Sequence, residues 1–204
     1  MIKRLGIGIV DEEKIAIGFK LILEGLGLNI KDNPHLASTP ERAARAWYNE
    51  LCRGLTQDAP KITTFESDVD EMVMLRHIPI RSICAHHLLP FLGEATIAYV
   101  PGTGKLLGLS KLSRIADYYA RRPQVQEDLT AQIADSIAEL VINTKAEIRG
   151  GVGVVIRARH LCMELRGVNH TGDMITSAVR GVFLTKPEAR AEFLELRQEI
   201  RTNI

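Results

Sequence analysis

The sequence predicts an α+β protein, in which an antiparallel β-sheet carries helices on one face and follows a helical N-terminal region. The chain has 204 residues, of which 46% are hydrophobic and 25% charged, as in an ordinary folded protein. Its hydrophobic period gives the order helix pair, strand pair, helix pair, strand pair, helix. Strand pairs that flank a helical pair are typical of this class. We therefore expect a helical region over residues 1–58 and one structural and catalytic unit over residues 59–204.

The first quarter of the chain has the signals of two helices. Asp11 can cap a helix that Gly27 ends, and its apolar residues recur at helical spacing: Ile15, Phe19, Ile22 and Leu26. The run Ser38-Thr39-Pro40-Glu41 combines cap residues, a first-turn proline and an acidic residue that favours the helix dipole. It predicts a second helix that ends near Gly54.

Strand character begins after Pro60. Residues 72–82 and 94–100 are rich in apolar and β-branched side chains, and Pro101-Gly102 predicts a turn after the second run. Strand character returns after Gly150-Gly151, and residues 174–184 predict one more strand.

The remaining segments have a helical period. Between Ser110 and Asn143, Pro123 separates two helices, and a last helix begins at Pro187. Four strands form a small sheet with open edges, and pairing those edges between copies of the chain would remove them. We therefore expect a ring-shaped homo-oligomer.

Composition and charge exclude several classes of protein. The formal net charge of +1 offers no broad basic surface for a nucleic acid. No run approaches the roughly 18 apolar residues of a membrane span, and residues 1–8 lack the apolar centre of a secretory signal, so we expect a cytoplasmic protein with no membrane partner. Three cysteines, an odd number, do not make a disulfide framework for a chain of this length.

Two short segments concentrate residues that bind metals. They are Cys84-Ala85-His86-His87 and His160-Leu161-Cys162, each at the end of an expected strand. A buried cysteine is often only a small apolar residue, but these segments hold two of three cysteines and three of six histidines. If residues 160 and 162 share a strand face and a turn brings His87 to Cys84, then Cys84, His87 and Cys162 could bind zinc and leave one position open. His86 and His160 would then be placed to move protons or to orient a ligand.

Other polar residues fit a nucleotide. A predicted helix begins with Ser110, Lys111 and Arg114, and the serine can act as its cap. The helix terminus and the two cations together suit a polyphosphate. The alternative is that these residues form only an exposed charged turn. There is no Gly-Lys-Ser/Thr, so the sequence has no P-loop. Gln126 and Glu127 could pair with a guanine edge, although such residues are common in a first helical turn. Arg166 adds a cation close to Cys162.

The motifs together resemble the GTP cyclohydrolase I family. The resemblance runs from about Thr39 to Phe193 and rests on four segments: residues 82–87, 108–114, 122–127 and 160–167. It implies the tunnelling fold, with a barrel assembled from several subunits, usually a decamer of two pentamers, and active sites between subunits. It also implies hydrolysis of GTP to 7,8-dihydroneopterin triphosphate and formate, the first step of pterin and folate-type biosynthesis, with Zn²⁺ and no organic cofactor.

The resemblance assigns a role to each candidate residue. Zinc would be bound by Cys84, His87 and Cys162, and acid–base steps would fall to His86 and His160. The triphosphate would be held by Ser110, Lys111, Arg114 and Arg166, and the guanine by Gln126 and Glu127. Arg42 and Arg45 resemble basic residues that a neighbouring subunit contributes.

Two departures from the family pattern leave alternatives open. Ala85 stands where the family usually has glutamate, and residues 168–175 form a shorter and less basic loop. We expect altered metal affinity or a lower rate, and a protein that binds GTP and zinc with reduced or lost turnover is one alternative. A nitrile reductase of the same fold, using a cysteine nucleophile and NADPH, is disfavoured by the zinc ligands and the triphosphate residues.

Overall fold

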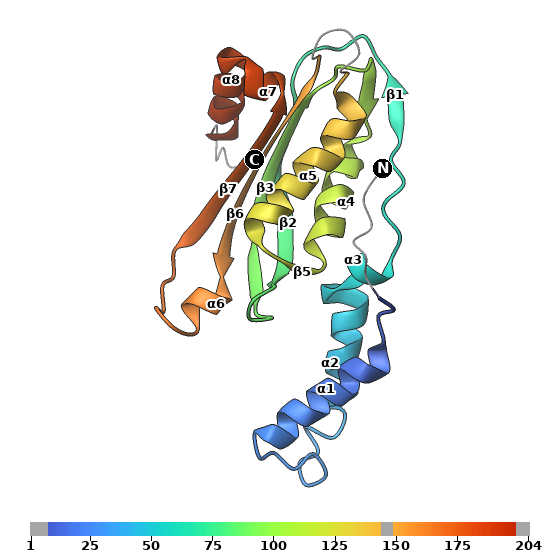
Figure 1. Ribbon diagram of the computed structural model, residues 1–204, viewed down its shortest axis with the longest axis vertical. Helices are drawn as coiled ribbons and strands as arrows, with labels where there is room; N and C mark the ends of the chain where they lie inside the picture. The colour runs from blue at the N-terminus through green and yellow to red at the C-terminus, as the bar shows by residue number, and fades with distance from the viewer. Residues whose placement is uncertain (1–7, 144–148, 199–204) are drawn as a thin grey trace, which may run out of the picture. The chain divides into compact units, whose positions relative to one another are not determined.

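The computed structural model describes residues 8–143 and 149–198 and shows two compact units, of which one ends at Asp58 and the other begins at Ala59. The N-terminal unit is helical, and all strands of the described residues lie in the C-terminal unit (Figure 1). None of the helices in the described ranges is both long and apolar enough to cross a membrane.

The N-terminal unit contains α1 (Glu12–Gly25), α2 (Thr39–Ala46), the π-helical turn η1 (Trp47–Leu51) and α3 (Arg53–Thr56). The predicted cap of α1 is confirmed, because the Asp11 carboxylate accepts a hydrogen bond from the Lys14 N–H at 3.1 Å. Phe19 of α1 meets Trp47 edge to face, with ring centroids 5.9 Å apart. The predicted apolar face is only partly covered, since Ile22 and Leu26 are 58% and 69% exposed.

The second predicted helix differs from the observed one in two details. It begins at Thr39, with Ser38 at the N-cap position and Pro40 in its first turn as predicted, but the Ser38 side chain makes no capping hydrogen bond. It also does not run unbroken to Gly54, because the backbone widens into the π-helical turn η1 before α3. Hydrophobic periodicity alone does not distinguish these helix types.

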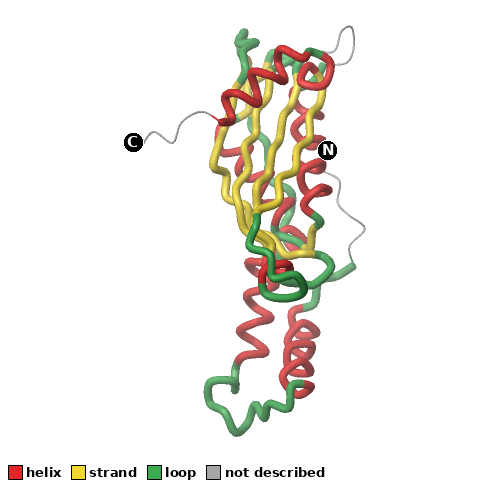
Figure 2. The backbone as a smooth tube through the Cα atoms, turned by 90° about the vertical axis from the view of Figure 1, so that its left-hand side faces the viewer, coloured by secondary structure: helices red, strands yellow, loops and turns green. Residues whose placement is uncertain are grey.

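The C-terminal unit is built on one five-stranded sheet in the order β5-β2-β3-β6-β7. The four long strands run antiparallel and side by side (Figure 2): β2 (Val73–Cys84), β3 (Pro90–Val100), β6 (Gly151–His160) and β7 (Asp173–Gly181). The short β5 (Pro123–Gln124) pairs in parallel with the end of β2. The expected α+β class and antiparallel sheet are confirmed.

Two strand predictions needed correction, and one two-stranded ribbon was not predicted. The strand expected to reach Leu184 ends at Gly181, which has φ 62°, and is followed by the short helix α7 (Val182–Thr185). A Cβ at Gly181 would lie 2.3 Å from the carbonyl oxygen of Gly150, so a side chain does not fit there. β3 starts at Pro90 rather than Glu94. The ribbon of β1 (Thr64–Glu66) and β4 (Lys105–Leu107) was not predicted, because three residues are too few to show a period.

Helices α4 (Leu109–Ala120) and α5 (Gln126–Val141) pack on one face of the sheet, as expected. Alternate strand residues, including Ile97 and Tyr99 of β3 and Val154 and Ile156 of β6, join the main core. The helices contribute fully buried apolar residues to the same core: Leu112, Ile115, Leu129, Ile133 and Ile137.

The opposite face of the sheet holds a smaller core. Ala98 and Val155 point to this side and pack with Phe183 of α7 and Phe193 of α8 (Pro187–Gln198). The two rings lie 5.5 Å apart, and Gly153 leaves the space that Phe193 fills, since a Cβ there would be 2.8 Å from that ring. The last predicted helix is therefore confirmed, but it covers part of the second face, so the expectation that the helices lie on one face only is wrong.

Replacing Phe193 with alanine is expected to lower the free energy of unfolding by about 3–4 kcal/mol, because the ring is fully buried and its loss leaves a cavity. Chemical denaturation would measure this change. Leu194→Ala is the matched control, since Leu194 is the next residue of α8 and is 38% exposed. Equal effects of the two substitutions would show that the second core does not depend on the Phe193 ring.

Candidate metal centre and active site

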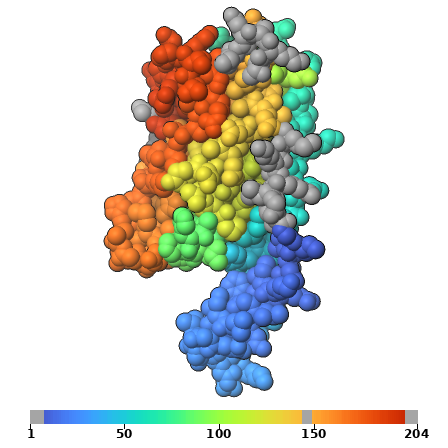
Figure 3. Space-filling model, in the orientation of Figure 1, coloured from blue at the N-terminus to red at the C-terminus, as the bar shows by residue number. Residues whose placement is uncertain are grey.

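The sheet register brings the two metal-binding segments together. β2 and β6 both pair with β3, where Ile83 lies opposite Pro90 and His160 lies opposite Phe91. Consequently the ends of β2 and β6 meet at one end of the sheet. In the space-filling view the loop after β2 and the segment after β6 lie beside each other (Figure 3).

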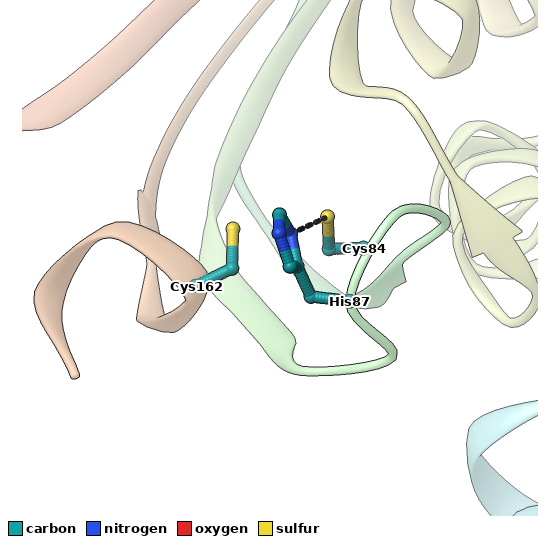
Figure 4. A group of neighbouring side chains, drawn as sticks. All are labelled: Cys84, His87 and Cys162. Atoms are coloured by element: carbon teal, nitrogen blue, oxygen red, sulfur yellow. Dashed lines mark hydrogen bonds between the residues drawn. The ribbon is translucent and has the colours of Figure 1, made fainter. Parts of the chain in front are cut away.

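Cys84, His87 and Cys162 form a compact group at this end (Figure 4). One potential ligand atom from each of them lies within 4.8 Å of the others. The turn after β2 is closed by a hydrogen bond from the Leu88 N–H to the Cys84 carbonyl at 2.9 Å, and Leu88 has φ 55°. This turn returns His87 to Cys84, with Nδ1 3.8 Å from Sγ.

The structure corrects how Cys162 reaches the group. We expected residues 160 and 162 to share a strand face, but β6 ends at His160 and Cys162 lies in the short helix α6 (Leu161–Glu164). Arg159 and Glu164 connect the strand to this helix through two hydrogen bonds, at 2.8 and 2.7 Å. The helical turn, rather than strand alternation, therefore directs the Cys162 thiol towards Cys84.

The chemistry of these residues fits zinc. Two thiols and one imidazole are ligands that Zn²⁺ prefers, and tetrahedral bonds of about 2.0–2.3 Å place ligand atoms a little under 4 Å apart. Both cysteines are free and buried, while His87 is exposed. Burial, followed by the neighbouring Cys84 thiol, raises the pKa of Cys162. Three ligands with one exposed side are the arrangement of a catalytic rather than a structural zinc site.

The two other histidines lie beside this group. His86 Nδ1 is 3.9 Å from the Cys84 sulfur, and the side chain is exposed. His160 stacks on the Phe91 ring with centroids 4.6 Å apart, and its Nε2 lies 2.7 Å from Oε1 of Gln126. Burial lowers the pKa of His160, and the Glu127 carboxylate opposes this shift.

The expected guanine residues lie next to the metal group but differ from each other. Gln126 and Glu127 are the first two residues of α5, as predicted. Glu127 is exposed and free to meet a ligand, whereas Gln126 is buried and its amide binds the protein itself. Arg166 also lies at the group, with Nη1 2.7 Å from His87 Nε2.

The predicted phosphate residues are elsewhere in the C-terminal unit. Ser110, Lys111 and Arg114 lie in the first turns of α4, whose last residues lead into β5 beside Cys84. A helix of 12 residues is about 18 Å long, so Ser110 and Lys111 lie most of a helix length from the end of α4 that leads to the metal group, and Arg114 about half as far. Gly108, not Ser110, is the N-cap residue, which leaves the exposed Ser110 hydroxyl inside the first turn.

Known proteins are similar to this chain along nearly its whole length. The sequence profile of GTP cyclohydrolase I matches residues 15–198. The chain belongs to the GTP cyclohydrolase I family. It is 48% identical over 190 residues to GTP cyclohydrolase 1 of Carboxydothermus hydrogenoformans, an alignment that covers 92% of this chain and 95% of that protein.

Other relatives of the GTP cyclohydrolase I family match to a similar extent. GTP cyclohydrolase 1 of Hahella chejuensis is 46% identical over 90% of this chain and 95% of its own length. The protein of the same name from Thermoanaerobacter pseudethanolicus is 45% identical over 92% of this chain and 97% of its own length.

Sequence reasoning missed several residues that position the site of this GTP cyclohydrolase I family member. Phe91 supports His160, Thr176 accepts a hydrogen bond from the Gln126 side-chain amide, and Thr130 donates to the Gln126 main-chain carbonyl. No motif marks these residues, because only the paired strands and helix bring them together. Arg42, expected at a substrate site, lies on α2 and donates to the His35 carbonyl at 3.0 Å, and Arg45 lies on the same helix.

Proposed function

We propose that this chain is a GTP cyclohydrolase I, which adds water to GTP and releases formate and 7,8-dihydroneopterin triphosphate. The observation that carries the proposal is the Cys84, His87 and Cys162 group, with ligand atoms within 4.8 Å of one another and His160 at its side. The reaction needs no redox cofactor, since only water is consumed. We place it in the cytoplasm, at the start of pterin and folate-type biosynthesis.

Zn²⁺ is the proposed cofactor, held by Cys84, His87 and Cys162. When bound, it supplies a Lewis acid that activates water at neutral pH for attack on an electron-poor carbon. His86, whose Nδ1 lies 3.9 Å from the Cys84 sulfur, and His160, two residues before Cys162, are proposed to accept and return protons during the opening of the imidazole ring of GTP. Glu127 can accept hydrogen bonds from guanine, because its carboxylate is exposed beside His160.

The triphosphate is assigned to cations that lie apart from the metal group. Ser110, Lys111 and Arg114 open α4 without any acidic residue in the first turn, which favours an anion. Since the length of α4 separates them from their own Cys84, we propose that each active site combines the metal group of one copy with the α4 terminus of another. Arg166, beside His87, is the phosphate-binding residue on the metal side.

A ring of copies would satisfy this requirement. In the described sheet β7 pairs only with β6. Its other edge is therefore open to a strand of a second copy. Closure of several sheets into a barrel gives the proposed homo-oligomer, a decamer of two pentamers. Arg42 and Arg45 are proposed to reach an active site from a neighbouring copy.

The test is incubation of zinc-loaded protein with GTP, with formate and the oxidised, fluorescent pterin both followed. Equal amounts of formate and pterin are expected, and removal of zinc by a chelator should stop both until zinc is returned. Binding of GTP and zinc without either product would instead support a protein that has lost turnover. Consumption of added NADPH would indicate the nitrile reductase chemistry, which the names of the relatives do not support.

Restoring glutamate at position 85 is expected to raise kcat or zinc affinity by about 3–10-fold. Ala85 is exposed next to Cys84, and its N–H is bonded to the Gln124 carbonyl at 2.9 Å, so a longer side chain can extend from it without disturbing the turn. Ala85→Gln is the control of equal size without charge. If Ala85→Glu changes neither quantity, the alanine at position 85 limits neither kcat nor zinc affinity.

A further inference from the structure

Gln126 is a fully buried polar residue at the start of α5, with only 1% of its surface exposed. Its amide nitrogen Nε2 lies 3.2 Å from the Ile156 carbonyl oxygen, 3.1 Å from that of Met174 and 3.0 Å from the Thr176 hydroxyl. Carbonyl oxygens only accept hydrogen bonds, so the NH₂ group must face the strands β6 and β7. The amide oxygen Oε1 must then face His160.

A second layer of hydrogen bonds holds this amide in place. The Thr130 hydroxyl lies 2.7 Å from the main-chain carbonyl oxygen of Gln126, which only accepts hydrogen bonds, so Thr130 must donate to it. Because the single hydroxyl proton of Thr130 is taken by this bond, the bond to the Thr176 hydroxyl, 2.6 Å away, must be donated by Thr176. Thr176 is left to accept from the Gln126 amide. The donor and acceptor of each hydrogen bond in this network are therefore fixed, and the Gln126 side-chain amide has only one orientation that satisfies them.

The orientation of Gln126 determines where His160 carries its proton. Oε1 of Gln126 only accepts, and it lies 2.7 Å from Nε2 of His160, so Nε2 must donate. A neutral His160 is therefore protonated on Nε2 and has its lone pair on Nδ1. The parallel Phe91 ring, at an interplanar angle of 9°, holds the imidazole in this plane.

We propose that Gln126 is a positioning residue, which fixes the tautomer and plane of His160 so that Nδ1 is the nitrogen that takes up and returns the reaction proton. This inference rests on the proposed cyclohydrolase activity. It replaces the expectation that Gln126 pairs with guanine, because both ends of its amide are occupied by groups of the protein itself. Guanine recognition is then left to Glu127.

Steady-state kinetics distinguish the two roles of Gln126. In Gln126→Leu, loss of positioning should lower kcat by about 10²-fold and change the KM for GTP by no more than about twofold. Thr176→Val removes a partner of the amide that is not itself an expected substrate-binding residue, and should lower kcat about 3–10-fold, again with little change in KM. Glu127→Gln is the matched control and should mainly raise KM. A rise in KM with unchanged kcat in Gln126→Leu would restore the guanine role and overturn the proposal.

A spectroscopic measurement on the unmutated zinc-loaded protein does not depend on activity. Solid-state ¹⁵N NMR of histidine-labelled protein, with the His160 signals identified by comparison with His160→Gln, should show neutral His160 with its proton on Nε2. In Thr176→Val the same signals should shift or broaden. A proton on Nδ1 in the unmutated protein would contradict the proposal even if Gln126→Leu fails to fold. If the protein releases no formate but His160 carries its proton on Nε2, the cyclohydrolase activity is refuted, while the assigned tautomer of His160 is confirmed.

Discussion

Substitution of Cys162 by alanine is expected to abolish tight zinc binding and to lower kcat for formate release by at least about 10³-fold. Cys162 provides one of three ligands, and the two that remain, Cys84 and His87, belong to one turn. Two ligands do not hold a catalytic zinc against competing water and chelators. Metal content after dialysis and the rate of formate release measure both effects.

Cys52→Ala is the control for this substitution. Cys52 is also buried and free, but it lies in the helical N-terminal unit and burial alone raises its pKa. It should retain one zinc per chain and nearly unchanged turnover. Stoichiometric zinc in Cys162→Ala, with normal formate release, would show that the cysteine is only a core residue.

Mixing two variants, each of which is nearly inactive at a low concentration of GTP, is expected to restore activity. The chain with Lys111→Ala and Arg114→Ala keeps its metal group, and its KM for GTP should rise about 10²-fold because two charge-assisted contacts to phosphate are lost. Cys162→Ala keeps the α4 terminus. If each active site combines these parts from different copies, random assembly of equal amounts should regain about a quarter of the normal activity.

The mixture must be prepared by joint unfolding and refolding, or by co-expression with two different tags, so that mixed assemblies can be isolated. Simple addition of the two folded variants serves as the control and should remain inactive while copies do not exchange. If mixed assemblies are isolated and have no activity, the phosphate residues and the metal residues of each active site come from the same chain. That result would contradict the arrangement drawn from the length of α4.

The fold was largely predictable because its long elements have clear periods. The antiparallel sheet, α4, α5 and α8 were all expected, and Asp11 caps α1 as its position indicated. The failures have local causes. Gly181 ends β7 through a positive φ that an apolar run does not reveal, and β1 and β4 are too short to have a period.

The candidate site was predictable in composition but not in geometry. The motifs named the residues at the metal group, yet the strand argument for Cys162 was wrong because a helical turn follows His160. The role of Gln126 depends on carbonyl groups of β6 and β7, far from it in sequence. Likewise, the separation of Lys111 from Cys84 is set by the direction of α4, which residue spacing does not give.

GTP labelled with ¹³C at C8 provides the most direct test of the proposed reaction. Hydrolysis of the imidazole ring removes C8 as formate, so NMR should show the label passing entirely into formate, in equal amount to the pterin formed and only with zinc present. Label that stays in the nucleotide, in protein shown to bind zinc and GTP, would contradict the assignment of this chain as a GTP cyclohydrolase I.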